Sequence, residues 1–225
     1  MEKAIEIDPK FTPAIAYLGW SHHIDAQDGR GESKSSSWQH ALDAAKLAIS
    51  LDPDSADAHT LLGSTLINHL GAHDQGIAEL TMAVDLAPND AGAVALLGIY
   101  LSFAGRSEEG LEMAKRAMRL EPLPEDWFYN ALGSAYLFAG YYEEAIAALK
   151  ECLRRIPEFL PPNVSLVYAF MEAGQEDEAR VQAKDVLRID PNFSGEWYLA
   201  RIKNPGQMSR VKTLLQRAGL DFGSG

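Results

Sequence analysis

The chain has one cysteine and no long apolar run, and both shortages restrict what the protein can be. Cys152 has no second cysteine with which to form a disulfide inside the chain. A chain of 225 residues without disulfides fits a reducing compartment, so we expect a cytoplasmic protein. No stretch approaches the about 18 consecutive apolar residues of a membrane-spanning helix. Charged residues near Met1 occupy the place of a signal peptide's apolar core. We therefore expect a soluble protein that is not secreted by a standard signal.

Positive charge is also scarce. The sequence holds 20 Lys and Arg against 32 Asp and Glu, which gives a formal charge of −12. Nucleic acids and anionic membranes bind proteins through clustered Lys and Arg. We therefore expect neither a nucleic-acid partner nor a membrane partner. Hydrophobic residues make up 47% of the chain, which is enough to build a buried core.

A short phrase that ends in proline recurs along the chain. The prolines are Pro9, Pro53, Pro88, Pro122, Pro157 and Pro191, and their successive spacings are 44, 35, 34, 35 and 34 residues. This is the period of a helical hairpin repeat. A glycine recurs in the first half of the units, at Gly19, Gly63, Gly98 and Gly133. Because glycine inside a helix costs roughly 1 kcal/mol relative to alanine, we expect it to face a small residue and let the paired helices approach closely.

The fourth unit shows the motif most completely. It reads Tyr129-x2-Leu132-Gly133-x2-Tyr136, followed by Ala145-x3-Leu149, Cys152 and Pro157. Over residues 1 to about 193 the chain resembles the tetratricopeptide repeat family, with leucine in that family's phenylalanine position and cysteine in an alanine position. The resemblance implies an all-α fold, a right-handed superhelical solenoid of antiparallel helix hairpins.

The spacing divides one continuous solenoid into units. We expect a partial repeat at 1–9, full repeats at 12–53, 56–88, 91–122, 126–157 and 160–191, and capping helices at 194–220. The first full repeat is longer because of a polar stretch at 25–37, which we interpret as a loop with Ser36 and Gln39 forming a capping box. That loop is either a tolerated insertion or a lid that contacts a ligand. The partial repeat has no partner helix, so we expect the chain to be a segment of a longer protein.

A finer likeness lies in the stretch from Leu123 to Pro161. It is similar to the repeat regions that follow class III adenylate or guanylate cyclase domains, and winged-helix domains, in bacterial signalling proteins. The resemblance implies a bacterial regulatory module. Neither a cyclase nor a DNA-binding domain is present in this sequence, so neither activity is carried over.

The family's binding groove is lined by the first helix of each repeat. Carried onto this sequence, its positions are Tyr17, Trp20, His23, Thr60, Ser64, Asn68, Leu96, Ile99, Phe103, Asn130, Ser134, Phe138, Tyr168 and Met171. These side chains are apolar or neutral, which suits an extended or helical protein segment docked by its apolar face. Two alternatives stay open: the same side chains belong to the core, or a segment of the protein that is missing from this sequence fills the groove.

Residues with catalytic or metal-binding potential are few and poorly arranged. His69 and His73 are four residues apart, but Gly71 marks a turn between them. Ser209-x2-Lys212 matches a nucleophile motif without its companion motifs. We therefore expect no enzyme, no metal and no cofactor, and interpret the chain as a protein-binding scaffold. The alternatives are a helical-repeat RNA-binding protein, an enzyme with a site between repeats, and a homo-oligomer whose neighbour occupies the groove.

Overall fold

The structure is a computed structural model that describes residues 2–28 and 33–222. These ranges contain helices and turns and no strand, which confirms the all-α prediction. The chain divides into two compact units, Met1–Leu96 and Leu97–Gly225, and the division falls inside one helix. No helix within the described ranges has the length and apolar character needed to cross a membrane.

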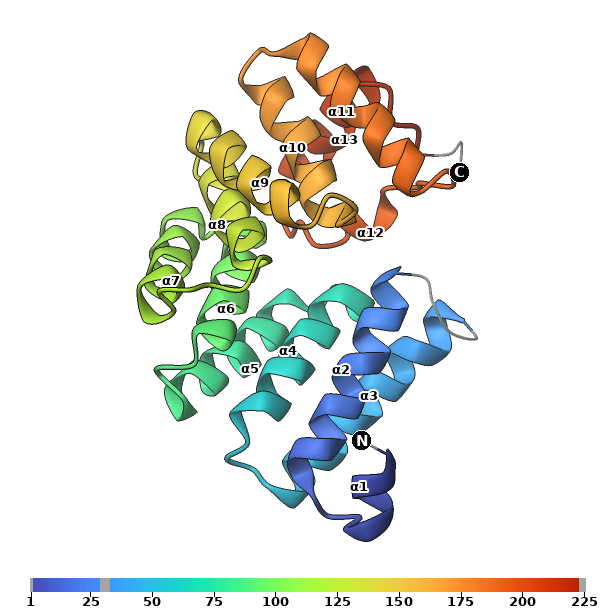
Figure 1. Cartoon of the computed structure of the whole chain (residues 1–225), viewed down its shortest axis with the longest axis vertical. Coiled ribbons are helices and arrows are strands. Elements are labelled where there is room, and N and C mark those ends of the chain that lie inside the picture. The colour runs from blue at the N-terminus through green and yellow to red at the C-terminus, as the bar shows by residue number, and fades with distance from the viewer. Residues whose placement is uncertain (1, 29–32, 223–225) are drawn as a thin grey trace. The chain divides into compact units, whose positions relative to one another are not determined.

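The first unit is built from helical pairs. Its helices are α1 (Glu2–Ile7), α2 (Thr12–Asp28), α3 (Lys34–Leu51), α4 (Ala56–Leu70), α5 (His73–Leu86) and the start of α6 (Ala91–Phe103). Helices α2 and α3 form one antiparallel hairpin and α4 and α5 the next, with α3 packed against α4 (Figure 1). Ile15, Ala48 and Ala58 form a buried cluster, and Ile5 of α1 packs against it. This contact attaches α1 to the first full hairpin.

The second unit continues the pattern. Its helices are the rest of α6, then α7 (Ser107–Leu120), α8 (Phe128–Phe138), α9 (Tyr142–Arg155), α10 (Leu160–Glu172), α11 (Glu176–Ile189), α12 (Glu196–Leu199) and α13 (Pro205–Arg217). Helices α8 and α9 pair, as do α10 and α11, while α7 packs against α8 and α13 against α10. The helical pairs stand beside one another in Figure 1. The stack follows from each hairpin's need to bury an apolar face against the next.

The turn between α8 and α9 shows how a hairpin closes. Gly140 adopts φ +84°, a left-handed conformation that glycine takes without steric cost. The N–H of Gly140 donates to the carbonyl oxygen of Leu137 at 3.2 Å. The N–H of Tyr141 donates to the carbonyl oxygen of Tyr136 at 2.9 Å. These bonds satisfy the last carbonyls of α8 and reverse the chain within a few residues.

The glycines within the helices mark close contacts between paired helices. A Cβ added to Gly63 would lie 2.6 Å from the carbonyl oxygen of Gly76, and one added to Gly76 would lie 2.6 Å from that of Gly63. Gly133 differs, because the atom nearest to an added Cβ there is Cγ of Leu149, also at 2.6 Å. The expected small neighbour is therefore found at Gly63, whereas at Gly133 a leucine fills the space.

Two sequence predictions about helix ends are wrong. Residues 25–28 and 34–37 are helical, so the predicted loop at 25–37 is too long at both ends, and its centre at 29–32 lies outside the described residues. The helix that follows is capped by Ser33, whose hydroxyl accepts the N–H of Ser36 at 3.0 Å, in place of the predicted Ser36 cap. Helix α13 begins at Pro205, because proline suits the first helical position. Asn204 caps it by accepting the N–H of Gln207 at 3.0 Å.

Candidate functional site

Three predicted groove residues form a continuous aromatic row in the second unit. Phe103 of α6 lies 4.7 Å from Phe138 of α8 between ring centroids, and Phe138 lies 6.0 Å from Tyr168 of α10. We call this row the aromatic wall. Its members are 2%, 8% and 4% exposed, respectively, so the wall is covered. Each ring comes from the first helix of its hairpin, as the repeat pattern predicts.

At Phe103 the wall is covered by the protein's own C-terminal segment, which we define as residues 193–222. Tyr198 of α12 lies 5.8 Å from Phe103 between ring centroids, in an edge-to-face arrangement. Its hydroxyl hydrogen-bonds to the hydroxyl of Ser165 in α10 at 3.0 Å, and its side chain is fully buried. Tyr198 therefore joins α10 to α6 across the face that carries the wall.

Two further contacts extend this attachment. The main-chain N–H of Lys203 donates to the carbonyl oxygen of Phe103, the last residue of α6, at 3.0 Å. The guanidinium of Arg210 in α13 donates two hydrogen bonds, of 2.7 and 2.6 Å, to the carboxylate of Glu172 at the end of α10. The side chain of Glu172 is only 5% exposed, whereas that of Arg210 is 62% exposed.

The polar groups at this attachment have shifted pKa values. Burial alone would raise the pKa of Glu172, but hydrogen bonds from Arg210 and Tyr168 outweigh it and lower the pKa. Burial, together with the nearby Glu172 carboxylate, raises the pKa of Tyr168. Burial also raises the pKa of Tyr198 to about 12. At neutral pH both phenols are therefore protonated and available as donors, and Glu172 is an ionised acceptor.

A cavity of about 660 Å³ lies beside the Glu172–Arg210 ion pair. Its walls come from the turns that follow α6 and α8, from α10, and from the start of α13. Residues on these walls include Gly105, Gly140, Tyr142, Tyr168, Asn204 and Arg210. The cavity therefore lies at the edge of the wall where the C-terminal segment meets the repeats.

In the first unit the predicted groove residues are exposed to different degrees. Tyr17 is 59% exposed and Trp20 is partly buried, packed against the cluster of Leu42 and Leu61. Tyr17, Trp20 and the 47% exposed Ile24 follow one another at intervals of three and four residues along α2. This spacing places them on one face of the helix.

His23 is part of the core of the first unit. It is 2% exposed, and its Nδ1 lies 3.0 Å from the hydroxyl of Thr65, while its Nε2 lies 3.2 Å from the Gln27 amide. Asn68 Nδ2 lies 3.3 Å from the same Nε2, and the ring of Trp38 meets the His23 ring edge-on at 4.8 Å. The contacts of Gln27, Thr65 and Trp38 with His23 were not predicted, since no motif spacing in the sequence connects these residues.

The other predicted groove residues are mostly buried as well. Their exposed fractions are 5% for Thr60, 0% for Ser64, 7% for Ile99, 8% for Asn130, 2% for Ser134 and 7% for Met171, while Asn68 and Leu96 are partly buried. The hydroxyl of Thr60 donates to the carbonyl of Ala56 in its own helix at 2.8 Å. Accessible groove surface is therefore concentrated at Tyr17 and Trp20 in the first unit.

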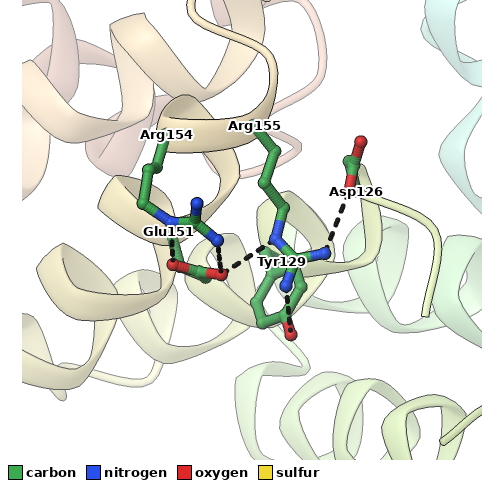
Figure 2. Close-up of polar contacts among 5 residues, drawn as sticks. All are labelled: Asp126, Tyr129, Glu151, Arg154 and Arg155. Carbon is green, nitrogen blue, oxygen red and sulfur yellow. Dashed lines mark hydrogen bonds and ion pairs between the residues drawn. The ribbon is translucent and has the colours of Figure 1, made fainter. Parts of the chain in front are cut away.

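A separate polar cluster lies in the α8–α9 repeat (Figure 2). Glu151 accepts hydrogen bonds from Arg154 at 2.9 Å and from Arg155 at 2.8 Å, and Arg155 also reaches Asp126 at 3.1 Å and lies over the ring of Tyr129. The bonds from Arg154, and then those from Arg155, lower the pKa of Glu151 to about 2. A carboxylate held ionised in this way is a poor proton donor near neutral pH. The cluster therefore connects the two helices of the α8–α9 hairpin.

Comparison with known proteins agrees with this architecture. A family model for the tetratricopeptide repeat matches residues 136–203, from the end of α8 to the turn after α12. The chain has the tetratricopeptide repeat fold. Among the described residues, no three His, Cys, Asp or Glu side chains gather as a metal site would require. No curated protein matches the sequence.

Several solved structures resemble the chain over most of its length. The type IV pilus biogenesis factor PilW is 18% identical with a TM-score of 0.63, covering 92% of this chain and 88% of its own. TTC0263, a thermophilic TPR protein of Thermus thermophilus, is 19% identical with a TM-score of 0.63, covering 91% and 99%. A chain of the APC/C hetero-tetramer Cut9–Hcn1 is 16% identical with a TM-score of 0.69, covering 97% and 45%. At these identities the likeness concerns the fold alone.

Proposed function

We propose that this tetratricopeptide repeat chain is a non-catalytic scaffold that binds a segment of another protein along the first helices of its repeats. The supporting observation is that the aromatic wall already holds a polypeptide. Phe103 receives both the ring of Tyr198 and the main-chain N–H of Lys203. A surface that binds side chain and main chain together suits peptide recognition.

The accessible part of the groove lies on α2 in the first unit. Exposed Tyr17 and Ile24, with the partly exposed Trp20 between them, form an apolar stripe on one helix face. Tyrosine and tryptophan are the residues that most often dominate the binding free energy of protein interfaces. We infer that this stripe receives the apolar face of an amphipathic helix or an extended segment.

The cellular setting belongs to the same proposal. The resemblance around Leu123–Pro161 supports a cytoplasmic regulatory module of a bacterial signalling protein. The formal charge of −12 disfavours an RNA partner, since phosphate contacts need clustered cations. We regard self-association through the α2 stripe as a variant of this function.

The test is affinity capture followed by titration with the purified partner. Proteins captured by the intact chain are identified by mass spectrometry, and the affinity of each is then measured with Tyr17→Ala and Trp20→Ala. We expect each substitution to weaken binding about tenfold or more, as truncation of an aromatic hot spot does.

Val181→Ala is the matched control, because Val181 is 62% exposed and lies on α11, the second helix of its hairpin. It should leave the affinity unchanged. Equal binding by all three variants would exclude the α2 stripe as the docking surface. Light scattering of the purified chain separates self-association from binding to a different protein.

A further inference from the structure

We propose that the C-terminal segment is a tethered ligand of the aromatic wall, and that the outside partner of this wall is a basic segment presenting a similar tyrosine and arginine. The inference rests on the proposed scaffold function and specifies the chemistry of one of its partners. It concerns the second unit, whereas the α2 stripe belongs to the first.

The contacts of the segment resemble those of a bound peptide. Tyr198 inserts a ring against Phe103 and spans to Ser165 through its hydroxyl. The main chain at Lys203 then bonds to the end of α6, and Arg210 reaches Glu172. Aromatic anchor, main-chain bond and charged bond therefore follow one another along the segment, separated by five and seven residues.

The segment is closed at its base. Phe193 and Phe222 lie 6.1 Å apart between ring centroids, which brings its two ends together. Gly195 adopts φ +65° and lies directly under the ring of Phe222, where a Cβ would collide with that ring. A loop fastened at one point can leave the wall as a unit while the repeats keep their own hairpin contacts.

Charge favours a basic occupant. The segment holds five Lys and Arg (Arg201, Lys203, Arg210, Lys212 and Arg217) and two acids (Glu196 and Asp221), so its net charge is 5 − 2 = +3. The rest of the chain therefore carries −12 − 3 = −15. The two ion pairs from α13 join Arg210 to Glu172 and Arg217 to Glu176, so each places a segment cation on a repeat carboxylate. A competing segment needs the same sign of charge to bind here.

Docking of the C-terminal segment on the repeats also has a free-energy cost, which arises at Arg201. Arg201 is 8% exposed, and within the part of the chain that the structure describes its guanidinium lies 4.9 Å from the ring of Trp197 and interacts with the phenols of Tyr100 and Tyr198. Burying a guanidinium among aromatic groups gives up hydration that an ion pair would have replaced. This cost favours release of the segment when a competitor offers equal contacts without it.

A partner can begin binding at the cavity of about 660 Å³ beside Glu172. Arg210 is 62% exposed there, so an incoming guanidinium can replace it at Glu172 before Tyr198 leaves the wall. The short connection from α11 gives the resident segment an effective concentration of ~1 mM. A free segment of equal affinity at ~10 µM therefore binds the intact chain only when the resident contacts are weakened.

The experiment uses the full chain and a labelled synthetic peptide with the sequence of residues 193–222. A Tyr198→Ala/Arg210→Ala double variant loosens the resident segment and leaves the wall unchanged. We expect the peptide to bind this variant at least tenfold more tightly than it binds the intact chain. Gln216→Ala on the exposed side of α13 is the matched control and should behave as the intact chain does. A scrambled peptide of the same composition should bind none of them, since its tyrosine and arginine no longer have the spacing of Tyr198 and Arg210.

Amide hydrogen exchange of the intact chain is a second test of the proposal, and it does not require that the double variant folds. We expect the amides of α12 and α13 to exchange at least tenfold faster than those of α8 and α10, because a ligand-like segment opens without global unfolding. Equal exchange rates would show that the segment is a permanent part of the core and overturn the proposal. The proposal would also be overturned if the double variant folds but does not bind the peptide.

The outcomes separate this inference from the scaffold function. If the peptide fails but a partner still binds through Tyr17, the tethered-ligand proposal is wrong and the scaffold stands. If the peptide binds but no protein depends on Tyr17 or Trp20, the α2 stripe is wrong and the wall remains the binding surface.

Discussion

Gly98 of α6 and Gly110 of α7 lie against each other without room for a side chain. A Cβ on Gly98 would lie 2.9 Å from the carbonyl oxygen of Gly110, and one on Gly110 would lie 2.7 Å from that of Gly98. Real Cβ atoms do not approach backbone oxygens this closely, so the pair sets the separation of the two helices. The structure thus gives the recurring glycines a packing reason that offsets their cost in helix propensity.

Replacing Gly98 with alanine should therefore destabilise the protein. Helix propensity alone would favour alanine by roughly 1 kcal/mol, but the added methyl group would also meet the backbone nitrogen of Ala114 at 2.9 Å. We expect a net loss of about 1–3 kcal/mol, which is typical of overpacking, measured by urea unfolding.

Gly92 in the first turn of α6 is the control for this substitution. A Cβ there meets only the side-chain carboxylate of Asp90, at 3.2 Å, which can shift. Gly92→Ala should leave the free energy of unfolding unchanged or slightly raised. Equal losses at Gly92 and Gly98 would mean that close helix approach is not the reason for the glycine.

The repeat architecture was predictable from sequence because it depends on local rules. Proline ends helices, glycine permits close approach, and the spacing of Pro53, Pro88, Pro122, Pro157 and Pro191 sets the period of the hairpins. The helix pairs of the structure fall within the five expected repeat ranges. Helix ends were less predictable, since Ser33, Ser36 and Ser37 all stand where a cap is needed and the choice depends on packing.

The cover over the aromatic wall was not predictable in the same way. Tyr198 and Arg210 lie where the repeat pattern decays, and no periodic spacing links them to Ser165 or Glu172, 33 and 38 residues earlier. Long-range contacts of single side chains leave no mark in local periodicity. The sequence therefore predicted capping helices at 194–220 without predicting that Tyr198 contacts Phe103.

The hydroxyl of Tyr198 should contribute to stability through its bond to Ser165. Tyr198→Phe removes this bond and leaves a buried serine hydroxyl without its partner, which we expect to cost about 1–3 kcal/mol in urea unfolding. The Tyr198→Phe/Ser165→Ala double variant should lose less than the sum of the two single variants, because the two groups act as a pair. Additive losses would show that the hydroxyls do not interact in solution.

Cys152 should be chemically inert in the folded protein. It is fully buried in α9, and burial raises the pKa of its thiol to about 12. Only the thiolate reacts with iodoacetamide, so at pH 8 alkylation should be about a thousandfold or more slower than for a free cysteine of pKa about 8.5. Mass spectrometry checks this with and without urea, which should restore the ordinary rate. Rapid modification of the folded chain would contradict the assigned burial.

The carboxylate of Glu151 should remain ionised at pH values well below 4.5, down to about 2. Hydrogen bonds from Arg154 and then Arg155 lower its pKa from 4.5 to about 2. Since the folded value is the lower one, the ion pairs stabilise the fold fully above pH 4.5, and this contribution disappears as the pH falls through about 2. Carbon-detected NMR titration of the Glu151 carboxyl measures the shift directly.

Arg154→Ala tests the cause of that shift. It removes two of the hydrogen bonds to Glu151 and leaves those of Arg155 to Glu151 and Asp126 in place. The pKa of Glu151 should rise toward 4.5 without reaching it, because one guanidinium still faces the carboxylate. Arg180→Ala on α11, whose bonds go to Glu176 and Asp177, is the control and should leave the Glu151 titration unchanged. If Arg154→Ala leaves the pKa of Glu151 unchanged, the hydrogen bonds from Arg154 to Glu151 drawn in Figure 2 do not form in solution.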